Sequence, residues 1–113
     1  MVITFTDRKL QALANDDRKR VRELGAARAA KLQQRLDQLR AATTLEDLRF
    51  AAGRFHELRE DRKGQWACDL DQPYRLVFEP HEQPIPTNAS GQYLWVEIKA
   101  VEVVEIVNYH KEK

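Results

Sequence analysis

The chain has 113 residues, with 19 Lys and Arg against 18 Asp and Glu, a single cysteine and four prolines. This length predicts one domain that buries enough apolar surface to fold without a metal or a disulfide. A lone cysteine is typical of a reducing compartment, no apolar run approaches the ~20 residues of a membrane helix, and no signal-peptide pattern is present. We therefore expect a soluble, cytoplasmic protein.

The positive charges are concentrated in the first part of the chain. Residues 1–65 contain 15 Lys and Arg against 10 Asp and Glu, whereas residues 66–113 contain 4 against 8. One surface can therefore be basic on a nearly neutral protein, which would suit a polyanionic partner such as RNA. A solvated charged face explains the same asymmetry, and charge alone favours that ordinary explanation.

The first quarter of the chain is expected to form a strand followed by helical segments. Val2 to Phe5 is short, β-branched and aromatic, which is typical of a strand. Thr6 can cap the helix that follows, and the polar run Asn15-Asp16-Asp17 interrupts this helix and can cap another segment. That segment carries the densest basic cluster, Arg18 to Arg22, which we interpret as an exposed face rather than a direct RNA contact.

The main helix is expected over Ala26 to Ala41, after Gly25. Apolar residues recur in this segment at steps of three and four, at Ala29, Leu32, Leu36 and Leu39. The spacing predicts an amphipathic helix packed on a sheet, with its charged residues, Arg35 among them, elsewhere on the cylinder. Thr43 with Glu46, or Thr44 with Asp47, then resembles a capping box that begins a short helical turn ending near Arg49.

The centre of the chain predicts three antiparallel strands joined by tight turns. Trp66 to Leu70 and Tyr74 to Glu79 alternate apolar and polar side chains with the period of a strand. Pro73 lacks an N–H and cannot continue a ladder, so Asp71-Gln72-Pro73 is expected to form a hairpin turn. Asp61-Arg62-Lys63-Gly64 reads as another turn, with glycine for a left-handed position, which leaves Arg54 to Arg59 as the preceding strand.

These strands carry His56, Arg59 and Arg75, with few acidic residues opposite them. Cys68 lies in the second strand without a cysteine partner. We interpret it as a small buried apolar residue rather than as a nucleophile.

A proline-rich loop, at about residues 80–97, separates the meander from the last strand and is interpreted as an excursion within one domain. His81 in this loop is expected to be a solvated side chain. From about Ile98 to Val107 apolar residues occupy both odd and even positions and so both faces of a strand, which is typical of a strand in the middle of a sheet. This strand ends in Asn108-Tyr109-His110.

The sequence contains no glycine-rich phosphate loop, no paired cysteines and no HExxH motif, so nucleotide hydrolysis and zinc chemistry have no supporting motif, and no cofactor is expected. The remaining histidines, arginines and tyrosine suit metal-independent RNA cleavage. That reaction needs a base for the 2′-hydroxyl proton, an acid for the leaving 5′-oxygen and cations for the pentacovalent phosphate. More than fifty residues separate His56 from His110, and spacing alone favours structural roles for both.

Three stretches of the chain resemble a known family. The segment RFHELREDRKGQW from Arg54, the strand from Tyr74 to Phe78 and the terminal VEIVNYH resemble the HigB-type toxins of the RelE/ParE superfamily. The proline-rich loop resembles that of their longer subgroup, often called plasmid-maintenance killer or killer-suppression proteins. The resemblance covers most of the chain, and its string H-x-L-x-x-D-R-K-G-Q-W is fairly specific.

The resemblance implies an α+β toxin with the order β-α-α-β-β-β-β, in which helices pack on one side of a twisted, mainly antiparallel sheet. It implies cleavage of mRNA on the translating ribosome without a metal, which leaves a 2′,3′-cyclic phosphate and a 5′-hydroxyl. A HigA-like helix-turn-helix antitoxin would neutralise the toxin and connect it to operator DNA.

Residue by residue, the resemblance assigns the catalytic group to His56, Arg59, Arg75, Asn108, Tyr109 and His110. Arg59 stands where the family has lysine, and its role is phosphate stabilisation because a guanidinium stays charged near neutral pH. Asn108 stands where the family has aspartate, and Tyr109 would stack on or orient the RNA. Either histidine could be the acid or the base. Arg54, Arg62 and Lys63 are assigned to RNA binding.

Two alternatives remain open from the sequence. A toxin that binds a different target, as in the gyrase-poisoning ParE branch of the superfamily, would need neither histidine. A catalytically inactive regulatory partner would bind its antitoxin without arresting growth.

Overall fold

One five-stranded sheet organises residues 1–109, the part of the chain that the computed structural model describes. Its strands are β1 (Val2–Phe5), β2 (His56–Glu57), β3 (Trp66–Asp69), β4 (Tyr74–Pro80) and β5 (Ala100–Asn108). They lie in the order β1-β5-β4-β3-β2, with β1 parallel to β5 and all other neighbours antiparallel. The β-branched strand β5 is therefore interior to the sheet, as its sequence predicts.

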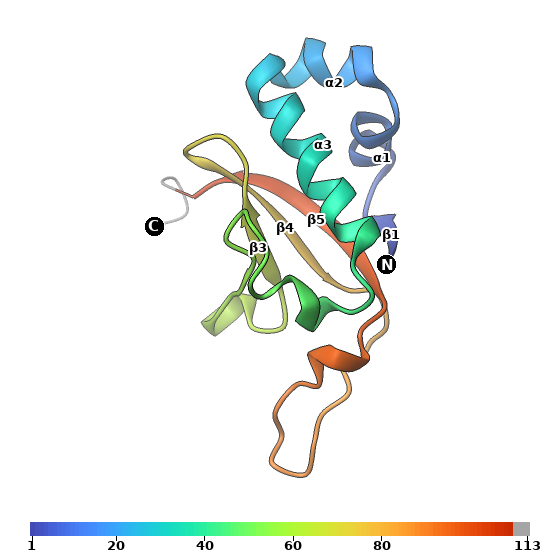
Figure 1. The fold of residues 1–113 in the computed structure, drawn as a ribbon, viewed down its shortest axis with the longest axis vertical. Coiled ribbons are helices and arrows are strands. Elements are labelled where there is room, and N and C mark those ends of the chain that lie inside the picture. The colour runs from blue at the N-terminus through green and yellow to red at the C-terminus, as the bar shows by residue number, and fades with distance from the viewer. Residues whose placement is uncertain (110–113) are drawn as a thin grey trace.

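Three α-helices, α1 (Arg8–Asn15), α2 (Asp17–Leu24) and α3 (Ala26–Ala41), pack on one side of this sheet (Figure 1). The α+β class is therefore confirmed, but the order with two helices is wrong. Asp16 accepts a hydrogen bond from the Lys19 N–H and begins α2, and Gly25, at φ 82°, separates α2 from α3. Asp7 rather than Thr6 caps α1, because its carboxylate accepts a hydrogen bond from the Leu10 N–H at 2.8 Å.

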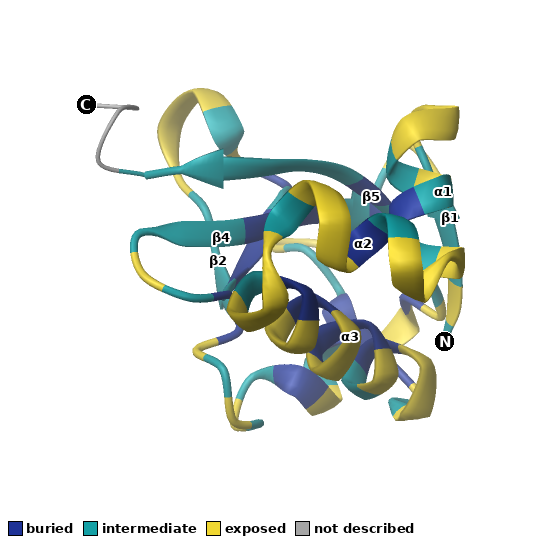
Figure 2. Ribbon diagram, turned by 90° about the horizontal axis from the view of Figure 1, so that it is seen from above, coloured by how far each residue is buried: buried dark blue, intermediate teal, exposed yellow. Residues whose placement is uncertain are grey.

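Helix α3 has the predicted bounds and supplies the centre of the core. The residues at its three- and four-residue steps are buried, namely Ala29, Leu32, Leu36 and Leu39. The three leucines share one apolar cluster with Leu76 and Phe78 of β4 and with Val101 and Val103 of β5. Figure 2 shows the buried stripe of α3 turned toward the sheet. Truncation of one such leucine to alanine typically costs about 2–5 kcal/mol.

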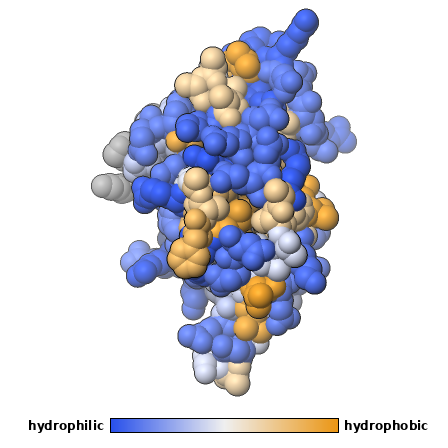
Figure 3. Space-filling model, viewed as in Figure 1, coloured by the Kyte–Doolittle hydropathy of each residue, from blue (hydrophilic) through white to orange (hydrophobic). Residues whose placement is uncertain are grey.

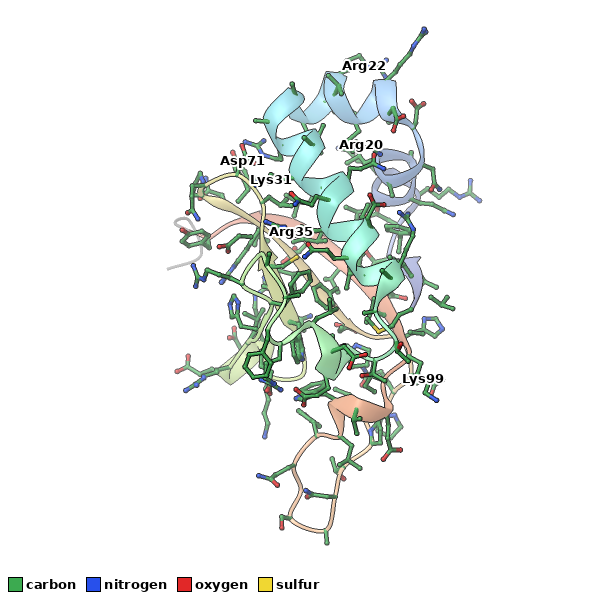
Figure 4. The ribbon with its side chains drawn as sticks, in the orientation of Figure 1. Arg20, Arg22, Lys31, Arg35, Asp71 and Lys99 are labelled. Carbon is green, nitrogen blue, oxygen red and sulfur yellow. The ribbon has the colours of Figure 1, made fainter. Side chains whose placement is uncertain are left out.

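Arg35 is buried, which corrects its assignment to the outer side of α3. Its side chain is 5% exposed, and its Nε donates a hydrogen bond to the backbone oxygen of Asp69 at 2.6 Å. Nη1 donates to Oε1 of Gln38 at 3.0 Å. Figure 4 shows Arg35 directed from the helix toward the β3–β4 strands. The guanidinium therefore links α3 to the end of β3.

A second arginine links the same helix to the β3–β4 turn. Nε of Arg28 lies 2.9 Å from Oδ1 of Asp71, and its Nη2 lies 3.3 Å from Oδ2, so the pair is bidentate. The Arg28 Cζ lies 3.4 Å from the centroid of the Tyr74 ring. A planar guanidinium suits both contacts, and together they hold the hairpin against α3.

The first strand of the meander is shorter than predicted. The sequence predicts this strand over Arg54 to Arg59, but β2 contains only His56–Glu57. Arg54, at φ 53°, and Glu60, at φ 57°, adopt left-handed conformations that interrupt the extended chain on either side. The short helix η2 (Glu60–Arg62) then leads to Gly64, whose φ of 97° agrees with the predicted left-handed position.

The capping box after α3 begins at Thr44 rather than at Thr43. The Thr44 N–H donates to Oδ2 of Asp47 at 3.0 Å, and the short helix η1 (Leu45–Leu48) follows. Its leucines, Leu45 and Leu48, are buried in the core. The predicted helical turn before Arg49 is therefore confirmed.

The proline-rich loop extends beyond the end of the sheet that lies away from α2 (Figure 1). An isolated bridge between Thr87 and Tyr93 closes it, and the short helix η3 (Trp95–Glu97) returns the chain to β5. Phe50 after η1 and Val96 in η3 are exposed. Figure 3 shows a mostly hydrophilic face, with apolar side chains over the region of η1 and η3. No helix among residues 1–109 is long and apolar enough to cross a bilayer.

Candidate functional site

A row of four residues crosses the face of the sheet that α3 does not cover, which we call the open face. The register pairs His56 with Ala67, Ala67 with Val77, and Val77 with Glu105. Directly paired residues point to the same side of a sheet. Ala67 and Val77 are small and fully buried, so they form a floor between the larger side chains of His56 and Glu105.

The imidazole of His56 is oriented by the backbone. Its Nδ1 lies 2.6 Å from the carbonyl oxygen of Arg54. Because a carbonyl oxygen accepts hydrogen bonds and cannot donate them, the proton of the neutral ring is assigned to Nδ1. Nε2 then keeps its lone pair, which is the state that a general base requires.

The short strand that carries His56 is held by unusual backbone geometry. Arg54 and Glu60, on either side of β2, both have positive φ although neither is glycine. Such conformations cost on the order of 1–3 kcal/mol each, and they concentrate at functional sites. The sequence does not predict this geometry, because neither residue is of a type that favours a left-handed backbone.

A cavity of about 380 Å³ adjoins β2 and brings His56 together with Arg59 and Lys63. Arg49, Glu57 and Tyr93 also line it. Within residues 1–109, no ion pair joins Arg59 or Lys63 to a carboxylate. Two uncompensated cations beside an oriented imidazole suit a phosphate-containing ligand.

Arg49 differs from these two cations because carboxylates neutralise it. Its Nη2 lies 2.8 Å from Oε2 of Glu57, and its Nε contacts Glu46. The hydrogen bond to Glu46, together with that to Glu57, raises the pKa of the guanidinium above its usual value, against the opposing effect of burial. Its Cζ also lies 5.0 Å from the Trp66 ring centroid. Arg49 is therefore a wall of the cavity rather than a free anion ligand.

Arg62 extends over the open face and is embedded in a polar network. Its Nη2 is ion-paired to Glu105, and its Nη1 donates to Oε1 of Gln65 at 2.9 Å. The Gln65 side chain in turn donates from Nε2 to Oε1 of Glu79 at 2.9 Å. This network joins η2 to strands β4 and β5 and places a guanidinium near the floor of the open face.

Arg75 and Tyr109 lie together at the far end of the open face. Arg75 is paired with Asp69 on one side and with Val107 on the other, and its Cζ lies 5.2 Å from the centroid of the Tyr109 ring. The Tyr109 hydroxyl donates to the Gln72 side chain, which fixes the ring beside the β3–β4 turn. Arg54 contributes a further cation here, since its Nη1 lies 3.5 Å from Oδ2 of Asp69.

Asn108 does not share this face. It is paired with Tyr74, whose ring contacts Arg28 of α3, so the pleat directs Asn108 toward the side that the helices cover. His110, the remaining residue of the predicted site, lies outside the described residues.

The structure therefore divides most of the predicted residues into two groups, whereas Arg62 is ion-paired to Glu105 of β5. His56, Arg59 and Lys63 surround the cavity at β2, whereas Arg75, Tyr109 and Arg54 lie toward the ends of β3, β4 and β5. Sequence reasoning missed Glu105 and Tyr93. The pairing of Glu105 with Val77 depends on a bulge between Val77 and Phe78, which no local pattern reveals.

Other groups that could support different chemistry are absent from the described residues or inert. No cluster of His, Cys, Asp and Glu within residues 1–109 could hold a metal ion. Cys68 is fully buried, as predicted, and burial raises the pKa of its thiol far above the usual range. A thiol of this kind stays protonated and is a poor nucleophile.

The fold is that of the RelE-like toxins. A solved structure described as a YoeB/ParE toxin from Agrobacterium tumefaciens superposes with a TM-score of 0.53 over 94% of this chain and 95% of the other, at 16% sequence identity. The sequence model of the HigB-like toxins, described as RelE-like toxins of the type II toxin-antitoxin system HigB, matches residues 3–94. The chain belongs to this HigB-like toxin family, whose members pair with an antitoxin. No curated protein matches the chain.

Proposed function

We propose that the chain is a ribosome-dependent mRNA endoribonuclease, acts in the cytoplasm and is neutralised by a HigA-like helix-turn-helix antitoxin. The observation that carries the proposal is the cavity at β2. It combines a histidine whose Nε2 is available as a base with two cations that have no carboxylate partner in the described chain. A phosphate ester of RNA matches both features, because cleavage moves a proton and concentrates negative charge on phosphorus oxygens.

The reaction follows from these groups. Nε2 of His56 accepts the proton of a ribose 2′-hydroxyl while the 2′-oxygen forms a bond to the adjacent phosphorus. The bond from phosphorus to the 5′-oxygen breaks, and the leaving oxygen takes a proton from an acid, which leaves a 2′,3′-cyclic phosphate and a 5′-hydroxyl. The Arg59 guanidinium holds the phosphate charge, and its permanent positive charge excludes it from the proton transfers. We assign the acid to His110.

The second group of residues would bind the RNA on either side of this phosphate. Arg75 and Tyr109 already contact one another, and an aromatic ring with a guanidinium over it can receive an unstacked base. Arg54 and Arg62 would contact neighbouring phosphates. Asn108, which is directed toward the helices, would support the end of β5 rather than take part in proton transfer.

The test is induced expression of the wild type, His56→Ala and His110→Ala, with growth recorded and mRNA ends mapped by primer extension. We expect the wild type to arrest growth with new mRNA ends and both variants to lose the two effects. His81→Ala is a matched control, since this histidine lies at the opposite edge of the sheet, where its Nδ1 is 3.0 Å from the Thr4 hydroxyl. Retained binding of the antitoxin by each variant checks that it is folded.

Three other outcomes would overturn the proposal. Growth arrest without mRNA cleavage, unchanged in both variants, would indicate a different target, as in the ParE branch. No arrest by the wild type, with intact antitoxin binding, would indicate an inactive regulatory partner. Cleavage that persists in His56→Ala would show that the base is another residue.

A further inference from the structure

A second cavity continues the one at His56 along the proline-rich loop. It measures about 470 Å³, and it shares Arg49, Glu57, Lys63 and Tyr93 with the cavity of about 380 Å³ at β2. The loop supplies its outer wall through Asn88 and Gln92 among others. We call the joined space the loop groove. It leads from the candidate base to a part of the chain that the proposed reaction does not use.

Tyr93 is the aromatic side chain at the junction of the two cavities, and other rings support it from behind. The Tyr93 and Trp95 ring centroids lie 5.0 Å apart, and the Trp95 and Trp66 centroids lie 5.6 Å apart in an edge-to-face arrangement. Trp66 and Trp95 are buried, whereas Tyr93 is partly exposed. The core therefore fixes a tyrosine ring in the wall of an open groove, as in a stacking platform for bases.

Lys63 supplies charge at the same place. Its Nζ lies 5.6 Å from the Tyr93 ring centroid, at the outer limit of a cation–π contact, and it has no ion pair within residues 1–109. A contact this long holds the flexible ammonium only weakly, so the lysine can move to a phosphate while the ring receives a base. The Asn88 amide donates to Oε1 of Gln92 at 3.0 Å, which fixes polar groups in the outer wall.

We propose that the loop groove binds one nucleotide of single-stranded RNA next to the phosphate cleaved at His56, with the base on Tyr93 and the phosphate on Lys63. The inference rests on the proposed function in that it takes RNA as the ligand, but it assigns a binding subsite rather than a catalytic group. Its consequence is that the proline-rich loop takes part in the choice of the cleaved sequence.

The test uses an RNA oligonucleotide that is methylated at its 2′-oxygens and cannot be cleaved. Binding to the full chain is followed by fluorescence anisotropy in the wild type, Tyr93→Phe, Tyr93→Ala and Lys63→Gln. We expect the affinity of Tyr93→Phe for the RNA to lie within about twofold of the wild type. The affinity of Tyr93→Ala should be lower by about fivefold or more, because stacking needs the ring and not the hydroxyl. Thermal unfolding checks that each variant is folded.

Lys63→Gln tests the charge and leaves all three aromatic rings in place. It should weaken binding and reduce the slope of log affinity against log salt by about 0.7, the value for one contact to a single-stranded phosphate. Lys31→Gln is the matched control, since Lys31 is exposed on α3 (Figure 4) and its substitution removes the same charge. Equal effects of the two lysine variants would show that Lys63 acts only through the net charge of the protein, which would overturn the proposal.

The remaining outcomes separate the two proposals. Undetectable binding by the wild type, or equal binding by Tyr93→Ala and Tyr93→Phe in folded protein, would overturn the loop-groove subsite. Ring-dependent binding by a wild type that fails to cleave mRNA would support the subsite while the ribonuclease proposal fails.

Discussion

Arg62 in η2 is ion-paired to Glu105 in β5, although 43 residues separate them in the chain. The pair places a carboxylate on the open face, in the same row as His56. A carboxylate here competes with phosphate for the guanidinium, so its removal should strengthen RNA binding. We expect Glu105→Gln to bind single-stranded RNA severalfold more tightly than the wild type in an anisotropy titration at low salt.

The stability cost of this change should be small. Both side chains are partly exposed, at 29% for Arg62 and 41% for Glu105, and pairs of this kind contribute about 0.2–1 kcal/mol. Urea unfolding of Glu105→Gln should therefore lie within about 1 kcal/mol of the wild type. Glu23→Gln, which removes an exposed carboxylate from α2, is the control. An equal gain in affinity from Glu23→Gln would mean that net charge alone explains the effect.

Replacement of Arg54 by glycine should stabilise the protein while it weakens the toxin. The backbone of Arg54 has φ 53°, which glycine adopts without the steric cost that a β-carbon imposes. Its ion pair with Asp69 is long, at 3.5 Å, and the Arg54 side chain is 70% exposed, so its loss costs little. We expect the unfolding free energy to rise by about 0.5–1 kcal/mol and affinity for RNA to fall.

Arg59→Gly serves as the comparison for this prediction. Arg59 has an extended backbone at φ −125°, where glycine relieves no strain and adds flexibility to the unfolded chain. It should therefore lower stability in the same urea experiment. A gain in stability from Arg59→Gly as large as that from Arg54→Gly would contradict the role assigned to the left-handed conformation.

Arg35 and Gly53 should be energetically coupled. Arg35→Ala leaves the partly buried backbone oxygen of Asp69 without its 2.6 Å hydrogen bond, which alone costs about 1–3 kcal/mol. Gly53→Ala is also destabilising, because φ is 109° and the new Cβ would lie 2.6 Å from the Arg35 Cζ. In the double variant this collision disappears, so the loss of stability should be smaller than the sum of the single losses. Strict additivity in urea unfolding would show that the two positions act independently.

The elements predicted correctly are those whose signal is local and strong. Periodic leucines define α3, and β-branched residues on both faces of the strand place β5 inside the sheet. Helical periodicity places Arg35 on the wrong side of α3, because it reflects the charge of the residue and not the hydrogen bond that a buried guanidinium makes with a distant carbonyl. β2 is short because the left-handed conformation of Arg54 depends on tertiary contacts rather than on residue type.

The same distinction applies to the candidate site. The motif locates His56, Arg59 and Lys63, which the cavity at β2 brings together. It cannot indicate that Asn108 is directed toward the helices, because this follows from the register of β4 and β5. Tyr93 cannot be identified from the sequence for a related reason. A tyrosine in a proline-rich loop gains significance only when the folded loop places its ring beside Lys63.

The buried thiol of Cys68 should make stability depend on pH above the normal pKa of a cysteine. Burial raises the pKa of this thiol in the folded protein, whereas an unfolded thiol ionises at about 8.5. Above that pH the unfolded chain releases a proton that the native state retains, so the free energy of unfolding falls as pH rises. The stabilisation that the buried thiol provides is fully present below about pH 8.5. Above that pH, the free energy of unfolding falls because of this group by up to about 1.4 kcal/mol per pH unit.

Cys68→Ala isolates this effect, since every other titrating group is common to both proteins. Urea unfolding at pH 7.5, 8.5 and 9.5 should show the stability difference between wild type and variant shift toward the variant as pH rises. In parallel, a thiol reagent should modify the native wild type slowly at pH 8 and rapidly in denaturant, because the thiol has no exposed surface. A stability difference that stays constant across this range, or rapid modification of the native protein, would show that Cys68 is accessible to solvent.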